Sequence, residues 1–184
     1  ETGAPLVTTP EGTTNCKFWG LGADGTVGAN KNSIKIIGDN TDMYAQAYFD
    51  YDSKKSGGVT MSHLRFGKKP IKSTYLIHGA NFVACHNPAY MTKFNMVQEL
   101  VDGGTFLLNC VWNKDEIAEH IPGQVKKYMY DHKINFYIIN GVKIGIETGM
   151  GPTRINTILQ SAFFTLTGII PKEDANKLMK DAAQ

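Results

Sequence analysis

Long apolar runs and a strong excess of either charge are both missing from this sequence. No uninterrupted apolar stretch approaches the roughly 18 residues that a membrane-spanning helix requires. The formal net charge of +2 is too small to indicate a surface for nucleic acid, and no alternation of aromatic and basic residues suggests one. We therefore expect neither a membrane nor nucleic acid among the partners of this chain.

Cysteine is scarce, and the three that occur, Cys16, Cys85 and Cys110, are far apart with no C-x-x-C spacing. This pattern argues against a disulfide framework, a zinc site and an iron–sulfur site on the chain. The five histidines show no H-x-x-x-H or H-E-x-x-H spacing, so we predict no metal ligands. Cys85 and His86 are the only adjacent Cys and His, and chain neighbours seldom have the geometry of a nucleophile and its base. We predict no catalytic residue and expect reduced, buried thiols.

What is present fits one globular domain. The chain has 184 residues, of which 42% are hydrophobic and 20% charged, enough for a core of its own. Residues 1–14 are rich in Thr, Pro and Gly, and we interpret them as a linker or as residues added to the natural chain. Because the sequence opens with Glu-Thr-Gly, without an initiator methionine or a signal peptide, we expect a piece of a longer protein whose single domain spans 15–184.

Predicted strands and helices alternate along this domain. The helix expected over 88–101 starts at Asn87-Pro88, repeats apolar residues at 90, 94, 97 and 101, and stops at Gly103-Gly104. We expect strands at 17–20, 45–51, 59–66, 82–85, 105–111 and 135–140, and helices at 26–37, 88–101, 123–132, 154–167 and 172–183. This alternation predicts an α/β fold of three layers, α/β/α, with a mainly parallel sheet.

Gly20, Gly22 and Gly25 spell G-x-G-x-x-G between a short apolar strand and a helix. In phosphate-binding loops such glycines allow a tight turn, a close approach to pyrophosphate and close packing of helix on strand. Free N–H groups and the positive end of the helix dipole then face the anion. With 19 glycines the match also arises by chance, and the alternative is a tight turn without a ligand. Lys31 and Lys35 in the following helix favour the hypothesis of a phosphorylated ligand.

Charged residues follow the second predicted strand. In dinucleotide-binding loops an acidic residue here binds a ribose hydroxyl, and Asp50 and Asp52 are candidates, although they lie beyond the usual interval of about 20 residues. Lys54 and Lys55 come directly after them. A carboxylate beside two ammonium groups suits a ribose that carries a phosphate, as in NADP or coenzyme A. The alternative is a solvated polar turn.

Two further segments have two interpretations each. Arg65 ends a strand that we expect to be half buried, and it either binds a carboxylate or phosphate or, as we prefer, holds a neighbouring domain. The glycine-rich stretch Gly149–Asn156 precedes a long predicted helix. It is either a second anion site at a helix start or an ordinary flexible connection.

Six segments along nearly the whole chain from Cys16 onward share one resemblance: 18–38, 48–60, 62–67, 70–71, 85–88 and 149–156. Together they resemble the third domain of pyruvate:ferredoxin (flavodoxin) oxidoreductase. That domain is the counterpart of the gamma subunit in multi-subunit 2-oxoacid:acceptor oxidoreductases.

The resemblance implies an anaerobic enzyme, cytoplasmic or in an anaerobic organelle, that oxidatively decarboxylates pyruvate on thiamine diphosphate. Electrons pass through [4Fe-4S] clusters to ferredoxin or flavodoxin, and the acetyl group is delivered to coenzyme A. The resemblance further implies that this domain contributes to coenzyme A binding. By motif position, the phosphates of coenzyme A would contact Gly22, Asp24, Gly25 and Thr26. Its 3'-phosphoadenosine end would contact Lys54, Lys55 and Ser56, and Asn156 would make a further contact.

The chain departs from the whole enzyme in what it lacks. It has no cysteine-rich cluster motif, and no Gly-Asp-Gly with a later Asn-Asn to hold thiamine diphosphate and its Mg²⁺. We therefore expect those cofactors in other domains or subunits, which would be its partners, and no catalysis by this domain alone. Two alternatives stay open: an NADP-binding reductase domain that uses the same loop, and a structural clamp between domains in which the loop only packs.

Overall fold

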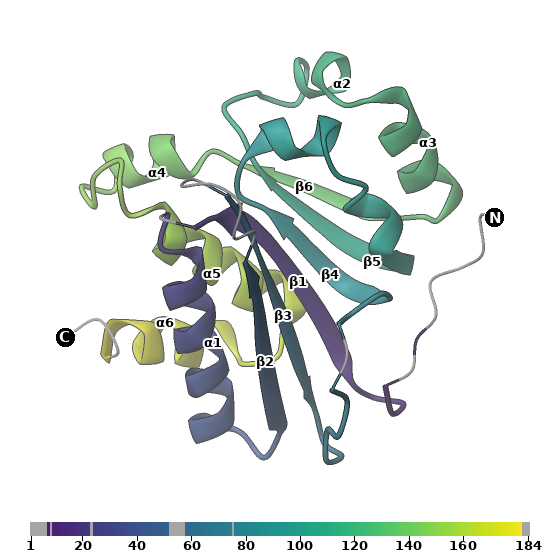
Figure 1. Ribbon diagram of the computed structural model, residues 1–184. Helices are drawn as coiled ribbons and strands as arrows, with labels where there is room; N and C mark the ends of the chain where they lie inside the picture. Colours follow the sequence, from purple (N-terminus) through teal and green to yellow (C-terminus); the bar gives the residue numbers. More distant parts are fainter. Residues whose placement is uncertain (1–6, 8, 23, 52–57, 75, 182–184) are drawn as a thin grey trace.

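The computed structural model describes residues 7, 9–22, 24–51, 58–74 and 76–181. Within these residues one sheet of six strands has the order β2-β3-β1-β4-β5-β6, with helices on both faces (Figure 1). The strands are β1 Thr14–Leu21, β2 Tyr44–Tyr51, β3 Val59–Gly67, β4 Ala80–Cys85, β5 Leu100–Asn109 and β6 Asn135–Ile139. The helices are α1 Thr26–Asn40, α2 Ile117–His120, α3 Gly123–Asp131, α4 Gly141–Glu147, α5 Ile155–Thr167 and α6 Lys172–Asp181, with two 3₁₀ helices, η1 Pro88–Thr92 and η2 Val97–Glu99.

The predicted α/β fold with three layers and a mainly parallel sheet is confirmed. Strands β1, β4, β5 and β6 are parallel neighbours, whereas β3 runs antiparallel to both β1 and β2. The exception has a simple cause, because only a short connection joins the end of β2 to the start of β3. A connection of that length allows an antiparallel pair but not a parallel crossover.

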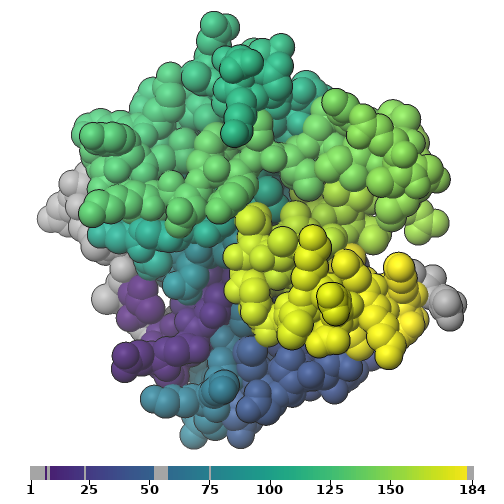
Figure 2. Space-filling view, turned by 180° about the vertical axis from the view of Figure 1, so that it is seen from behind, coloured from purple at the N-terminus to yellow at the C-terminus, as the bar shows by residue number. Residues whose placement is uncertain are grey.

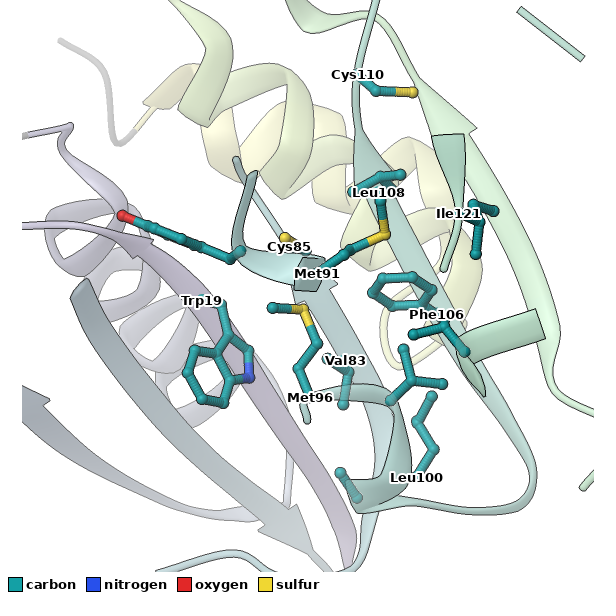
Figure 3. Close-up of a cluster of buried hydrophobic side chains, with 14 of the residues drawn as sticks. Trp19, Val83, Cys85, Met91, Met96, Leu100, Phe106, Leu108, Cys110 and Ile121 are labelled. Atoms are coloured by element: carbon teal, nitrogen blue, oxygen red, sulfur yellow. The ribbon is translucent and has the colours of Figure 1, made fainter. Parts of the chain in front are cut away.

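Alternation along β1 divides the core between the two faces of the sheet. Phe18 points to the face covered by α1, α5 and α6, where its ring and that of Phe82 lie 5.2 and 5.3 Å from the ring centre of Phe163. Trp19 points to the opposite face, where it packs with Val83, Phe106 and the 3₁₀ segments (Figure 3). The three cysteines are buried and unpaired.

The helix expected over 88–101 is wrong. Asn87 does cap a helical start, since its side chain accepts a hydrogen bond from the Ala89 N–H, but the chain forms only η1 and η2 before β5 begins at Leu100. Gly103 and Gly104 lie inside β5, beside a register shift in its pairing with β4. A Cβ on Gly104 would lie 2.9 Å from the Val101 carbonyl oxygen. This glycine pair therefore permits an irregular strand and does not end a helix.

The expectation that β3 is half buried, with Arg65 free to hold a neighbouring domain, is also wrong. Arg65 is only 2% exposed, and its Nη1 donates to Oε1 of Gln46 at 3.0 Å. The segment before β4 covers this face of the strand, because the Ile77 N–H donates to Nδ1 of His63 and the Ser73 carbonyl accepts from Gln46. Arg65 therefore acts inside this domain.

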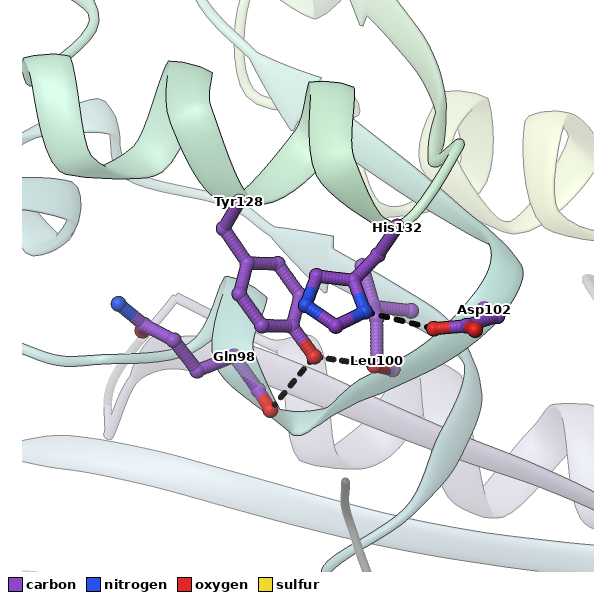
Figure 4. Close-up of polar contacts among 5 residues, drawn as sticks. All are labelled: Gln98, Leu100, Asp102, Tyr128 and His132. Atoms are coloured by element: carbon purple, nitrogen blue, oxygen red, sulfur yellow. Dashed lines mark hydrogen bonds and ion pairs between the residues drawn. The ribbon is translucent and has the colours of Figure 1, made fainter. Parts of the chain in front are cut away.

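A polar network fixes α3 to the start of β5 (Figure 4). The Tyr128 hydroxyl lies 2.7 Å from the Leu100 carbonyl and 3.2 Å from that of Gln98, and Nδ1 of His132 lies 2.6 Å from the Asp102 carboxylate. The Tyr128 and His132 rings stack at 3.9 Å. The network lies at the amino end of the parallel strands, whereas ligands of open α/β sheets bind at the carboxyl end. We therefore assign it a structural role.

Candidate ligand-binding cleft

A cleft of about 330 Å³ lies at the carboxyl ends of β1, β4 and β5. Helix α1 follows β1 on one face of the sheet, and η1 follows β4 on the other face (Figure 1). Neighbouring parallel strands whose connections diverge in this way form the usual ligand crevice of an open α/β sheet. The residues that line the cleft are Leu21, Asp24, His86, Asn87, Pro88, Asn109, Thr153, Ile155 and Asn156.

Two of the three motif glycines are needed for close packing at this cleft. A Cβ on Gly20 would lie 2.8 Å from Cβ of Thr26, so the glycine lets the start of α1 pack against β1. Gly25 has φ of 82°, and a Cβ there would lie 2.7 Å from Nδ2 of Asn156. A Cβ on Gly22 would meet only ordinary contacts. The motif therefore joins β1, α1 and α5 in one tight arrangement.

The Asp24 carboxylate binds the loop from within. It accepts hydrogen bonds from the N–H groups of Leu21 and Thr26, each at 2.8 Å, and from the Thr26 hydroxyl at 2.5 Å. The Gly22 N–H donates to the Gly58 carbonyl at 3.0 Å, and the Asp24 N–H to that of Leu21. The expected array of free amides is thus partly used by the protein itself.

Three amides at the start of α1 have no acceptor recorded within the part of the chain that the structure describes. Gly25, the N-cap of α1, has no side chain of its own to cap the helix, and the Asp24 carboxylate accepts the first helical N–H, that of Thr26. Within the described residues no acceptor is recorded for the N–H groups of Gly25, Val27 and Gly28. With the positive end of the helix dipole, these three amides can bind an anion.

His86 connects β4 to this loop. Its ring Nδ1 lies 2.7 Å from the Thr26 hydroxyl oxygen. Its backbone N–H donates to the Trp19 carbonyl at 2.9 Å, and its backbone carbonyl accepts from Nδ2 of Asn109. Burial lowers the pKa of His86 to about 4, and the nearby charge of Asp24 opposes this shift only in part. The imidazole is therefore neutral at neutral pH.

Two asparagines attach later segments to the cleft. The Asn156 side chain, in the first turn of α5, donates to the Asp24 carbonyl. Oδ1 of Asn109, at the end of β5, accepts from the Gly141 N–H at 3.0 Å and so positions the start of α4. The stretch Gly149–Asn156 thus serves packing as well, because the Gly151 N–H donates to the Gly145 carbonyl. No separate anion site is evident among its hydrogen bonds.

The structure brings together Gly22, Asp24, Gly25, Thr26 and Asn156 from the set of predicted site residues. The predicted Lys54, Lys55 and Ser56 lie outside the described residues, as does Asp52. Both ends of their connection lie near the loop, because Leu21 pairs with Val59 and Tyr51 with Thr60. Asp50 lies on the edge strand β2, which β3 separates from β1.

Sequence reasoning missed His86, Asn87 and Asn109 as cleft residues. The available signal was their position, since each directly follows or ends a buried strand of the parallel sheet. Cys85, next to His86, has no nucleophilic character. Burial raises its thiol pKa to about 12, and its Sγ lies 3.0 Å from the Asn87 carbonyl.

A second hollow, of about 670 Å³, lies between β6, α5 and α6. Figure 2 shows this side of the molecule, with α5 and α6 in yellow below the green of β6 and α4. Apolar residues such as Leu107, Ile139 and Ile158 make up most of its surface, and its lining also includes Lys172, Asn176 and Lys180.

Two negative findings apply to the described part of the chain. No group of three or more His, Cys, Asp or Glu side chains there is arranged to hold a metal ion. None of its helices combines the length and the apolar character needed to cross a membrane.

Comparisons with known proteins give a consistent result. The family model described as pyruvate ferredoxin/flavodoxin oxidoreductase matches residues 15–184. Pyruvate:ferredoxin oxidoreductase from Moorella thermoacetica is 57% identical over 175 residues, which are 95% of this chain and 15% of that protein. The chain thus spans about 15% of the length of this relative.

Solved structures share the fold at low sequence identity. The pyruvate oxidoreductase subunit PORC from Thermotoga maritima has a TM-score of 0.69 and 16% identity, over 94% of this chain and 86% of that subunit. The 2-oxoglutarate:ferredoxin oxidoreductase from Magnetococcus marinus, with 2-oxoglutarate, coenzyme A and succinyl-CoA bound, has a TM-score of 0.66 and 13% identity, over 94% of this chain and 27% of that one.

Proposed function

The chain belongs to the pyruvate ferredoxin/flavodoxin oxidoreductase family, and we propose that it is the domain of such an enzyme that contributes to coenzyme A binding. The whole enzyme converts pyruvate, coenzyme A and oxidised ferredoxin or flavodoxin to acetyl-coenzyme A, CO₂ and the reduced carrier. Thiamine diphosphate, Mg²⁺ and the [4Fe-4S] clusters belong to its other domains or subunits, which are the partners of this one.

The observation that carries the proposal is the cleft beside the start of α1, where the N–H groups of Gly25, Val27 and Gly28 have no recorded acceptor within the described residues. The N–H groups of Gly25, Val27 and Gly28 receive the pyrophosphate of coenzyme A on the outer side of the loop. A hydrogen bond from a neutral donor to a charged group contributes about 1.5 to 3 kcal/mol, so three such amides suffice to anchor a diphosphate. The coenzyme A in the solved Magnetococcus marinus relative supports this choice of ligand.

The 3'-phosphate end is assigned to Lys54, Lys55 and Ser56. The strands on either side of these residues end next to the loop, since the Gly22 N–H donates to the Gly58 carbonyl. An ammonium group held beside the cleft would distinguish coenzyme A from ligands without the third phosphate.

The described residues do not fit an iron–sulfur cluster. Cys16 belongs to the core under α1 and α5, whereas Cys85 and Cys110 belong to the core on the opposite face. Cluster ligation requires several thiolates around one site. We assign no electron-transfer step to this chain.

Calorimetric titration of the chain tests coenzyme A binding. We expect coenzyme A to bind more tightly than dephospho-coenzyme A, because only the former presents a phosphate to the lysines. Lys55→Ala should reduce this difference by about 1 to 3 kcal/mol, the contribution of one charge-assisted contact. The matched control, Lys69→Ala, removes an exposed lysine from the loop after β3 and should change neither affinity.

The same titrations separate the alternatives. Tighter binding of NADPH than of coenzyme A would favour the NADP-binding reductase domain. If Lys55→Ala leaves the coenzyme A affinity unchanged, the assignment of the lysine to the 3'-phosphate is wrong. If neither ligand binds, the structural clamp between domains is the remaining interpretation. With pyruvate, coenzyme A, thiamine diphosphate, Mg²⁺ and an electron acceptor, the chain alone should form no acetyl-coenzyme A. Product formation would contradict the proposed division of labour.

A further inference from the structure

The hydroxyl of Thr26 lies between the Asp24 carboxylate and Nδ1 of His86, and its single proton can be donated to only one of them. The Asp24 carboxylate already accepts from two backbone N–H groups, and at a separation of 2.5 Å the Thr26 hydroxyl donates to it as well. The backbone N–H of Thr26 donates to the same carboxylate oxygen. Thr26 itself is 0% exposed, so no solvent molecule substitutes for either partner.

This arrangement fixes the tautomer of His86. Because the Thr26 proton is used by Asp24, the Thr26 oxygen can only accept from Nδ1 of His86, 2.7 Å away. A neutral imidazole with its proton on Nδ1 has a bare acceptor at Nε2. Within the described residues Nε2 has no recorded partner, and it is not among the buried polar atoms that lack one.

The cleft is the route by which a ligand reaches this ring. His86 also borders a small hollow under α1 and α5, but that hollow holds about 10 Å³, room for no more than one water molecule. The only charged group among the described residues that line the cleft is the Asp24 carboxylate. A negative charge and a bare imidazole nitrogen repel phosphate oxygens and favour a donor.

We propose that Nε2 of His86 accepts a hydrogen bond from an uncharged N–H group of coenzyme A, either the adenine amine or an amide of the pantetheine arm. The inference rests on the proposed function and divides the ligand between two places. The diphosphate lies outside, on the amides at the start of α1, and a neutral donor-bearing part lies inside the cleft. Asp24 and Thr26 act as positioning residues, since they hold the imidazole in the accepting tautomer.

Nitrogen NMR of the ¹⁵N-labelled chain tests the tautomer and the contact separately. Without ligand, the His86 ring should show its proton on Nδ1 and a bare Nε2. Coenzyme A should shift the Nε2 resonance toward that of a hydrogen-bonded nitrogen. A proton on Nε2 in the free chain would overturn the inference, as would bound coenzyme A that leaves Nε2 unchanged.

Matched variants add an affinity test. His86→Asn places an amide near Nδ1 but nothing near Nε2, and it should weaken coenzyme A binding about fivefold, the equivalent of one neutral hydrogen bond. His86→Gln extends its amide toward the Nε2 position and should recover most of this loss. His78→Asn, at an exposed histidine, should have no effect.

Fragments identify the donor. Pantetheine and 3'-phosphoadenosine 5'-phosphate each carry one of the two candidate groups, and only the fragment that holds the true donor should lose affinity in His86→Asn. If wild type binds coenzyme A and His86→Asn binds it equally well, the inference alone fails. If wild type binds no coenzyme A, the proposed function fails and the inference fails with it.

Discussion

Thr26→Val is the sharpest test of the hydrogen-bond network around the cleft. Valine keeps the shape of threonine but removes a hydroxyl that is fully buried between Asp24 and His86. The bond to the charged carboxylate contributes about 1.5 to 3 kcal/mol and the bond to the neutral imidazole about 1 kcal/mol. The additional methyl group offsets about 0.8 kcal/mol of this loss. We expect the free energy of unfolding to fall by about 2 to 3 kcal/mol.

Urea unfolding of the purified chain measures this loss, with Thr26→Ser as the matched control. Serine keeps both hydrogen bonds and loses one buried methyl group, so it should cost only about 1 kcal/mol. The midpoint should shift with an unchanged slope, which would attribute the effect to stability and not to a different unfolded state. If valine costs no more than serine, the hydroxyl is not held between the two partners and our account of the network is refuted.

Two further predictions concern the loop and the buried imidazoles. Gly25→Ala should destabilise the fold by about 1 to 3 kcal/mol in the same assay, because residue 25 has φ of 82° and its new Cβ would contact the Asn156 side-chain amide of α5. The control Gly28→Ala, in open space within α1, should stabilise the fold by about 0.5 to 1 kcal/mol. Equal effects of the two substitutions would contradict the tight packing of residue 25 against α5. Burial lowers the pKa of His86 to about 4 and that of His63 to about 3. Below about pH 6.5 the unfolded chain therefore binds protons that the folded chain excludes. As the pH is lowered, the free energy of unfolding should decrease by up to about 1.4 kcal/mol per pH unit for each histidine. His86→Asn should reduce this pH dependence between about pH 6.5 and 4, and an unchanged slope in this variant would contradict the burial effect.

Local pattern was enough to predict most elements of the fold. Helix α5 follows from apolar residues such as Ile158, Leu159 and Phe163, which share one face, and the buried strands follow from short apolar runs. The error over 88–101 arose where pattern and glycine chemistry were both ambiguous. Gly103-Gly104 is compatible with the end of a helix and with an irregular strand, and only pairing with β4 decides between them.

The candidate site was predictable only where it is local in sequence. Gly22, Asp24, Gly25 and Thr26 belong to one motif, and Asn156 follows from family resemblance. His86 and Asn109 reach the cleft because β4 and β5 follow β1 in the sheet, and no local pattern specifies that strand order.

The internal role of Asp24 was not foreseen either. A short carboxylate beside free N–H groups competes with any ligand for them, and here it binds those of Leu21 and Thr26. Because of this competition, our proposal assigns the diphosphate to the other amides at the helix start.

The location of coenzyme A on the chain is the measurement that tests the account most directly. Backbone amide NMR shifts of the ¹⁵N-labelled chain, followed during titration with coenzyme A, report that location residue by residue. We predict saturable shifts at Gly25, Val27, His86 and Asn156, with none at Leu166 in the apolar hollow beside α6. Shifts confined to that hollow, or none at the start of α1, would contradict the claim that this cleft binds the coenzyme.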